Sequence, residues 1–124
     1  MPVIDKLCDN GQILYRIVYD PWEIEDLLSA DEAVRRHYDQ TTCKVHLLTN
    51  ISGVHRIPPA VYRLGRGMML THANSGLIVV VGATTLGRRL SETVFRIARV
   101  DRAAFFDSEE DAWAYLRKII ASER

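Results

Sequence analysis

Four residues between positions 84 and 89 have the types and spacing needed to bind a small anion. The run Gly82-Ala83-Thr84-Thr85 precedes a predicted helix, and two arginines follow one turn later. A helix N-terminus attracts anions through its free N–H groups and its dipole. The alternative is an ordinary helix cap beside solvated arginines, because the run matches neither a Walker A loop nor a GxGxxG pattern. The candidate ligands for an anion or a nucleotide phosphate are Thr84, Thr85, Arg88 and Arg89.

Ser52 is a second candidate, because it precedes Gly53 just after a predicted strand. It is either a turn or capping serine or a regulatory phosphoacceptor. No GxSxG motif surrounds it, so the sequence does not predict a serine nucleophile. The histidines show neither HxH nor HExxH spacing, which argues against a metal site. We therefore expect no catalytic residues, no metal and no cofactor, and a protein that is not an enzyme. The histidines are His37, His46, His55 and His72.

A third candidate group is an interaction surface. Two glycines fall inside a predicted helix, where each costs about 1 kcal/mol relative to alanine. Two methionines follow, and methionine adapts easily to a partner surface. A close neighbour over the glycines would compensate for their cost. That neighbour is a second copy of the chain, another protein, or the chain's own core. The four residues are Gly65, Gly67, Met68 and Met69.

Alternating strands and helices must position these candidates. An Asn10-Gly11 turn joins two apolar segments into a hairpin, and Asp20-Pro21-Trp22-Glu23 is typical of a helix start. The run Leu77–Val81 is apolar throughout, which is typical of a strand buried on both faces. A third helix is capped by Thr84 or Thr85, and a fourth begins in the acidic cluster 107–111. Further expected elements are strands at 3–7, 12–19, 44–49 and 103–106 and helices at 21–38 and 58–72.

The expected fold class is therefore α/β, in the order β-β-α-β-α-β-α-β-α. Strand–helix alternation after the hairpin predicts a mainly parallel central sheet with helices packed on it. We expect Leu77–Val81 inside the sheet and the hairpin at one edge. The length of 124 residues suits a single domain spanning residues 1–124.

Composition excludes some partners. The formal net charge is zero, so no general electrostatic attraction to nucleic acid or to an anionic membrane is expected. The charge is uneven, with an excess of three negative charges in residues 1–62 and three positive charges in residues 63–124. This pattern indicates either solvated helix faces or a basic face for an acidic partner or a second copy. The widely spaced Cys8 and Cys43, and the lack of a signal-peptide pattern, predict a cytoplasmic protein.

The run Asn50-Ile51-Ser52-Gly53-Val54 resembles the Asp-Leu-Ser-Gly-Val motif of STAS domains, the SpoIIAA-like family of anti-sigma-factor antagonists. The order of elements is similar to that of the family over nearly the whole chain. The resemblance implies a signalling module that works by binding a protein partner rather than by catalysis. The alternative function is a small protein that binds an anionic ligand or a nucleotide at Thr84–Arg89.

The chain departs from the family where the phosphorylated serine is expected. The family carries an Asp-Ser-Ser-Gly segment there, and this chain carries Ile57-Pro58-Pro59-Ala60. Proline cannot be phosphorylated, so the usual phosphoswitch is not predicted. The resemblance then implies a scaffold that binds a partner or a small ligand, and Ser52 is the nearest alternative phosphoacceptor.

Overall fold

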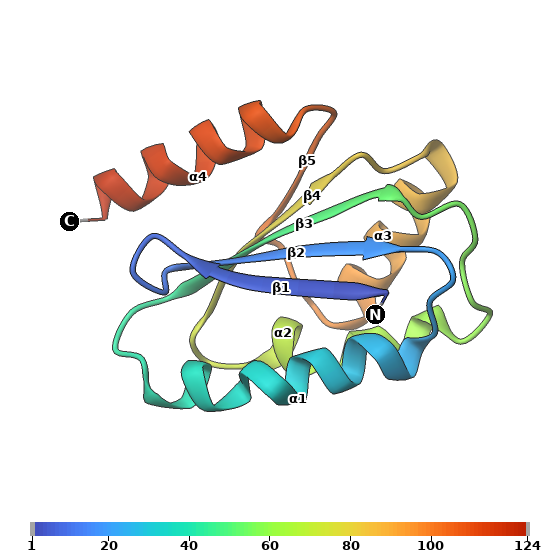
Figure 1. Cartoon of the computed structure of the whole chain (residues 1–124), viewed down its shortest axis with the longest axis horizontal. Coiled ribbons are helices and arrows are strands. Elements are labelled where there is room, and N and C mark those ends of the chain that lie inside the picture. The colour runs from blue at the N-terminus through green and yellow to red at the C-terminus, as the bar shows by residue number, and fades with distance from the viewer. Residues whose placement is uncertain (1, 124) are drawn as a thin grey trace.

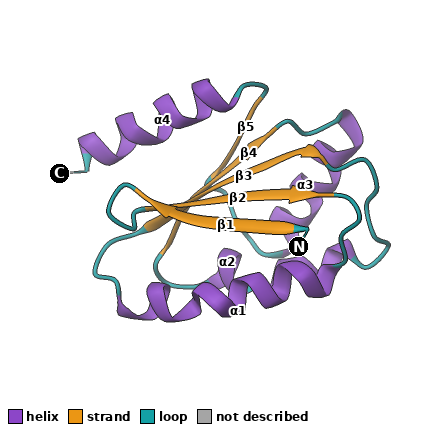
Figure 2. Cartoon of the chain, viewed as in Figure 1, coloured by secondary structure: helices purple, strands orange, loops and turns teal. Residues whose placement is uncertain are grey.

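The computed structural model describes residues 2–123, which form a five-stranded sheet with helices packed on it (Figure 1). The strands lie in the order β1-β2-β3-β4-β5, with β1 antiparallel to β2 and all later neighbours parallel. This α/β architecture confirms the predicted fold class (Figure 2). The elements are β1 (Val3–Cys8), β2 (Ile13–Tyr19), α1 (Ile24–Gln40), β3 (Val45–Gly53), the 3-10 helix η1 (Val61–Arg66), α2 (Met68–Thr71), β4 (Ser75–Val81), α3 (Thr85–Ile97), β5 (Ala103–Phe106) and α4 (Glu109–Ser122).

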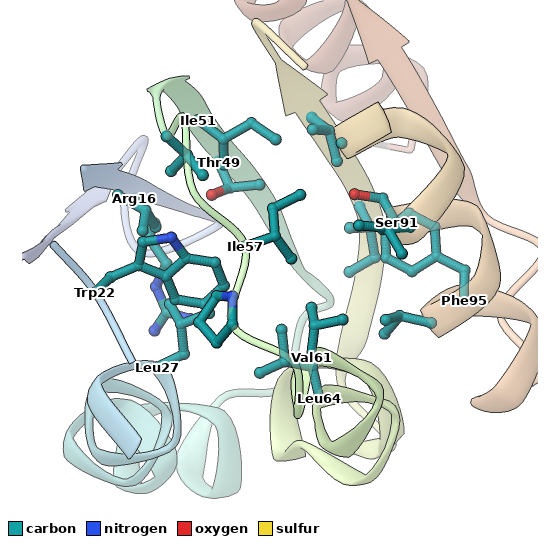
Figure 3. Close-up of a pocket in the computed structure, with 18 of the residues that line it drawn as sticks. Arg16, Trp22, Leu27, Thr49, Ile51, Ile57, Val61, Leu64, Ser91 and Phe95 are labelled. Atoms are coloured by element: carbon teal, nitrogen blue, oxygen red, sulfur yellow. The ribbon is translucent and has the colours of Figure 1, made fainter. Parts of the chain in front are cut away.

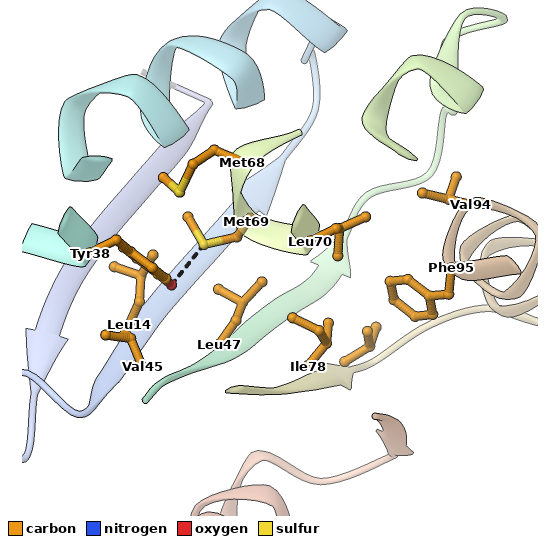
Figure 4. Packing of buried hydrophobic residues seen from close by; sticks show 11 residues of the cluster. Leu14, Tyr38, Val45, Leu47, Met68, Met69, Leu70, Ile78, Val94 and Phe95 are labelled. Atoms are coloured by element: carbon orange, nitrogen blue, oxygen red, sulfur yellow. Dashed lines mark hydrogen bonds between the residues drawn. The ribbon is translucent and has the colours of Figure 1, made fainter. Parts of the chain in front are cut away.

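Helices cover both faces of the sheet. α1, η1, α2 and α3 pack on one face and α4 packs on the other (Figure 1). On the first face, Leu14 and Leu47 of the strands pack in one cluster with Tyr38 of α1 and Phe95 of α3 (Figure 4). On the opposite face, Leu116 of α4 packs in a second cluster with strand residues. Within residues 2–123, no helix has the length and apolar composition needed to cross a lipid bilayer.

β4 lies inside the sheet between β3 and β5, and the β1–β2 hairpin lies at one edge, as predicted. Side chains along β4 alternate between the two faces. Val79 packs on the α4 side and Val80 packs on the α1–α3 side, and both are buried. A strand covered on both faces needs apolar residues at every position, which explains the uninterrupted run Leu77–Val81.

α1 begins three residues later than its sequence indicates. Its N-cap is Glu23, which forms a capping box with Asp26. Asp20, the first residue of the predicted helix start, has another role, because its Oδ2 accepts a hydrogen bond from the backbone N–H of His55 at 2.8 Å. The predicted start at residue 21 was wrong because a contact 35 positions away engages this carboxylate.

The helix predicted over residues 58–72 does not form. The chain makes the 3-10 helix η1 and then the single turn α2, with Gly67 in an extended conformation between them. A Cβ on Gly65 would lie 3.0 Å from Ile97 Cγ2, and one on Gly67 would lie 3.1 Å from Asp31 Oδ2. The close neighbours of both glycines are therefore α3 and α1 of the same chain.

β3 runs four residues beyond its predicted end and includes the segment 50–53. Gly82, just after β4, packs directly on Ser52 near the end of β3 and has a φ of +79°. Any side chain at this position would both meet Ser52 and require a disfavoured backbone conformation. The close approach brings the end of β3 beside the segment that leads into α3.

We predict that Gly76→Ala destabilises the protein by about 2–4 kcal/mol. A Cβ on Gly76 would overlap the buried His46 ring, whose Nδ1 accepts a hydrogen bond from the N–H of Leu77 at 2.8 Å. Gly87→Ala is the matched control, because its Cβ would lie 3.2 Å from Thr84 Oγ1 at its nearest contact. The control should change stability by less than about 1 kcal/mol. Urea unfolding measures both variants, and equal stabilities would refute the packing argument.

Candidate ligand-binding cavity

A cavity of about 410 Å³ lies on the α1–α3 face, between the sheet and the segments that cover it (Figure 3). We call it the α1–α3 cavity. Strands β2, β3 and β4 form its floor, and the loop 54–60, η1 and α3 form its walls. The volume falls in the range of sites that bind small molecules. Most of its lining is apolar and includes Trp22, Ile51, Ile57, Val61, Leu64 and Phe95.

The alternation of β2 and β3 determines which side chains face the cavity. Arg16 and Val18 of β2 point to this face, whereas Tyr15 points to the α4 face. Thr49 of β3 pairs in register with Arg16, and Ile51 follows two positions later on the same face. The floor is therefore apolar except for one guanidinium and one neighbouring hydroxyl.

The loop 54–60 covers one side of the cavity and is hydrogen-bonded to the segment that precedes α1. Trp22 Nε1 donates a hydrogen bond to the carbonyl of Arg56 at 2.9 Å, and the N–H of His55 donates to Asp20. Pro58 and Pro59 both line the cavity. The two prolines thus form part of the cavity wall.

Arg16 is the charged group of the floor, and two carboxylates hold it. Its Nε and Nη2 donate to Asp5 Oδ1 at 2.8 Å and to Asp5 Oδ2 at 2.9 Å, and its Nη1 donates to Asp31 Oδ1 at 2.7 Å. Only 4% of Arg16 is exposed. Burial lowers the pKa of Arg16, but the hydrogen bond to Asp5 and the charges of both aspartates outweigh this and raise it.

Asp31 lies on the other side of this guanidinium. Burial raises the pKa of Asp31, and the charge of Arg16 offsets only part of that effect. Asp31 also accepts a hydrogen bond from the N–H of Met69, the second residue of α2. The carboxylates and the guanidinium therefore bind one another, and the arrangement is better suited to fixing α1 and α2 than to transferring protons.

A second polar cluster lies on the opposite face, where α4 begins. Glu109 accepts hydrogen bonds from Tyr15 Oη at 2.7 Å, Asn50 Nδ2 at 2.8 Å and Trp113 Nε1 at 3.2 Å. Burial works to raise the pKa of Glu109, but these three donors outweigh it and hold the pKa below its ordinary value. Burial and the Glu109 carboxylate raise the pKa of Tyr15 to about 12. At neutral pH, Glu109 is therefore ionised and Tyr15 is protonated. Their hydrogen bond joins the start of α4 to β2.

The four predicted anion ligands lie at the N-cap and in the first turns of α3, and their surroundings differ. Thr84 caps α3 by accepting from the N–H of Gly87 at 3.0 Å, and it also lines the cavity. Thr85 and Arg89 are exposed outside the cavity lining. The guanidinium of Arg88 lies 4.7 Å from the centre of the Phe105 ring. Only Thr84 of the four candidates reaches the cavity.

Ser52 is exposed, and its Oγ donates a hydrogen bond to Asn50 Oδ1 at 2.6 Å. Its backbone N–H donates to the same oxygen at 2.9 Å. Such contacts are typical of a turn serine, which is one of the two roles that the sequence leaves open for Ser52. The fold also places Ser52 beside Gly82 near the start of α3.

The four residues predicted as an interaction surface are all buried. Met68 and Met69 belong to the core cluster of the α1–α3 face, where Tyr38 Oη donates to Met69 Sδ at 2.8 Å (Figure 4). Gly65 and Gly67 lie against α3 and α1. The chain's own helices supply the close neighbours of these residues, which agrees with the core packing that the sequence left open as one of three alternatives.

Sequence reasoning missed the two polar clusters because their members are far apart in the chain. Tyr15 and Glu109 are separated by 94 positions. Arg16 carried a usable signal, since it stands between Leu14 and Val18 on a strand face that is otherwise apolar. A charge at such a position indicates a buried ion pair. Within residues 2–123, no three His, Cys, Asp or Glu side chains are placed to hold a metal ion.

We predict that Glu109→Gln lowers stability at neutral pH, with the difference from wild type shrinking as the pH falls. The pKa of Glu109 is lowered in the folded state, so its contribution is full above the ordinary value of 4.5 and is lost as the pH falls through the lowered pKa. Glu110→Gln is the control, because Glu110 is exposed on the same first turn of α4. Urea unfolding at pH 7 and pH 3 tests this, and an equal loss for both variants at pH 7 would contradict it.

The sequence matches no protein-family model, and no curated protein matches it significantly.

Proposed function

We propose that this chain is a non-enzymatic, STAS-like regulatory module that binds a small, mostly apolar molecule in the α1–α3 cavity. The observation that carries the proposal is the cavity itself, with its volume of about 410 Å³ and its mainly apolar lining. A space of this size bordered by apolar side chains favours an apolar ligand, because burying apolar surface is the main source of binding free energy.

The polar groups of the cavity support binding rather than catalysis. Arg16 and Asp31 are engaged with each other, and Asp5 holds the other side of the guanidinium. A general acid or base needs a titratable group that can reach the substrate and exchange a proton with it. The ion pair instead gives the cavity a rigid floor.

The position of the two prolines supports a regulatory role. The STAS resemblance places a phosphorylated serine where Pro58 and Pro59 stand, and these prolines line the cavity. We infer that an occupied cavity replaces phosphorylation as the signal at this place. The ligand would contact the loop 54–60 from inside the cavity. A protein partner that binds the outer side of the loop would then sense a change in the loop's conformation.

The mouth of the cavity offers such a partner an apolar contact. Leu86 lines the cavity at the start of α3, yet 63% of it is exposed. A partner that contacts Leu86 and the loop 54–60 would sense whether the cavity is filled. Protein binding of this kind agrees with the function implied by the STAS resemblance.

Titration with N-phenyl-1-naphthylamine, an uncharged dye that becomes fluorescent in apolar surroundings, tests the proposal. We expect a saturable rise in dye fluorescence. Trp113→Phe leaves Trp22, in the cavity wall, as the sole tryptophan. Its emission should fall as the dye binds, because the dye absorbs light emitted by tryptophan.

Ser91→Phe should weaken dye binding by about tenfold or more, a loss of about 1.4 kcal/mol, because the ring fills part of the cavity. Ser91 lines the cavity from α3, whereas Thr93 is exposed on the same helix. Thr93→Phe is therefore the matched control and should bind the dye like the wild type. Binding that is the same in both variants would place the dye elsewhere and refute the proposed site.

A further inference from the structure

We propose that the ligand of the α1–α3 cavity is uncharged and carries a hydroxyl-like group that hydrogen-bonds to Thr49 or to Ser91. An aliphatic alcohol should therefore bind more tightly than the carboxylate or the ammonium of the same chain length. This inference rests on the proposed function, since it names the chemical class of the molecule that occupies the cavity.

The charged groups at the floor of the cavity already bind one another. One guanidinium, that of Arg16, faces the two carboxylates of Asp5 and Asp31, which leaves an excess of one negative charge. A ligand carboxylate that approached Arg16 would meet this excess. It would also have to lose its water without gaining a free cation, and burying an unpaired charge is costly.

A ligand ammonium gains little from the same group. Both oxygens of Asp5 accept hydrogen bonds from Arg16, and Asp31 accepts from Arg16 and from the N–H of Met69. A new cation would have to displace the guanidinium from an aspartate. The ion pair is thus closed to charged ligands of either sign.

Two hydroxyl groups border the cavity. Thr49 on β3 and Ser91 on α3 both line the cavity. Neither side-chain oxygen has a hydrogen-bond partner among residues 2–123. Figure 3 shows the two side chains reaching the cavity from its floor and from its α3 wall. A hydroxyl both donates and accepts hydrogen bonds, so each of these two groups can bind a neutral donor or a neutral acceptor on the ligand.

His55 lines the cavity from the loop 54–60 and is exposed. A carboxylate at the mouth near His55 would remain in contact with water. At that place the ligand carboxylate gains little from His55, because ion pairs at exposed sites contribute only about 0–1 kcal/mol. The half-buried hydroxyls of Thr49 and Ser91 therefore outweigh His55 in selecting the ligand.

Displacement of N-phenyl-1-naphthylamine by octan-1-ol, octanoate and octylamine at pH 7 tests the inference on the full chain. We expect octan-1-ol to displace the dye at a concentration about tenfold or more below that of either charged compound, as a difference near 1.4 kcal/mol requires. Octanoate or octylamine that competes as well as the alcohol would overturn the inference and leave the proposed function standing. Failure of the dye itself to bind would instead overturn the proposed function and this inference with it.

Thr49→Val removes the hydroxyl and keeps the shape of the side chain. It should weaken displacement by octan-1-ol about five- to tenfold, the effect of one lost hydrogen bond, and should change dye affinity by less than about twofold. Thr49→Ser keeps the hydroxyl and is the control. Ser91→Ala is a second variant with the same expected loss, and it covers the case in which a change in β3 disturbs folding. Unchanged alcohol binding in the folded variants would contradict the role of the hydroxyls.

Discussion

The buried guanidinium of Arg16 holds the elements around the cavity together. Its hydrogen bonds join β2 to Asp5 of β1 and to Asp31 of α1, and Asp31 in turn binds the N–H of Met69 at the start of α2. Removing one partner from such a pair typically costs about 3–5 kcal/mol, because the remaining charge is left buried without compensation. The position of α1 over the sheet, and of α2 beside it, therefore depends on one charged residue in the hairpin.

The cavity exists because the segment between β3 and α2 does not form a regular helix. Pro58 and Pro59 lie in the loop, and Gly65 and Gly67 are held close to α3 and α1. This segment covers the sheet with a loop and a short 3-10 helix, and space remains between them and the floor. The apolar floor and walls then favour a molecule with little charge, whereas the saturated ion pair of Arg16 gives no advantage to an ion.

Local patterns predicted most of the fold. The apolar run Leu77–Val81 indicated an interior strand, and Asn10-Gly11 indicated a hairpin turn, because each signal depends on neighbouring residues alone. The start of α1 was predicted three residues too early, because Asp20 binds the N–H of His55 instead of capping the helix. The helix expected over 58–72 failed for a similar reason, since contacts of Gly65 with α3 outweigh the helical spacing of its apolar residues.

The sequence by itself determined the order of elements, the mainly parallel sheet and the faces to which the strand residues point, because these follow from periodicity and turn chemistry. Only the tertiary structure decided that Arg16 meets Asp31, that Tyr15 meets Glu109, and that Thr49 and Ser91 border one cavity. These pairings join residues from separate elements, and the packing of helices on the sheet, which no local pattern encodes, brings them together.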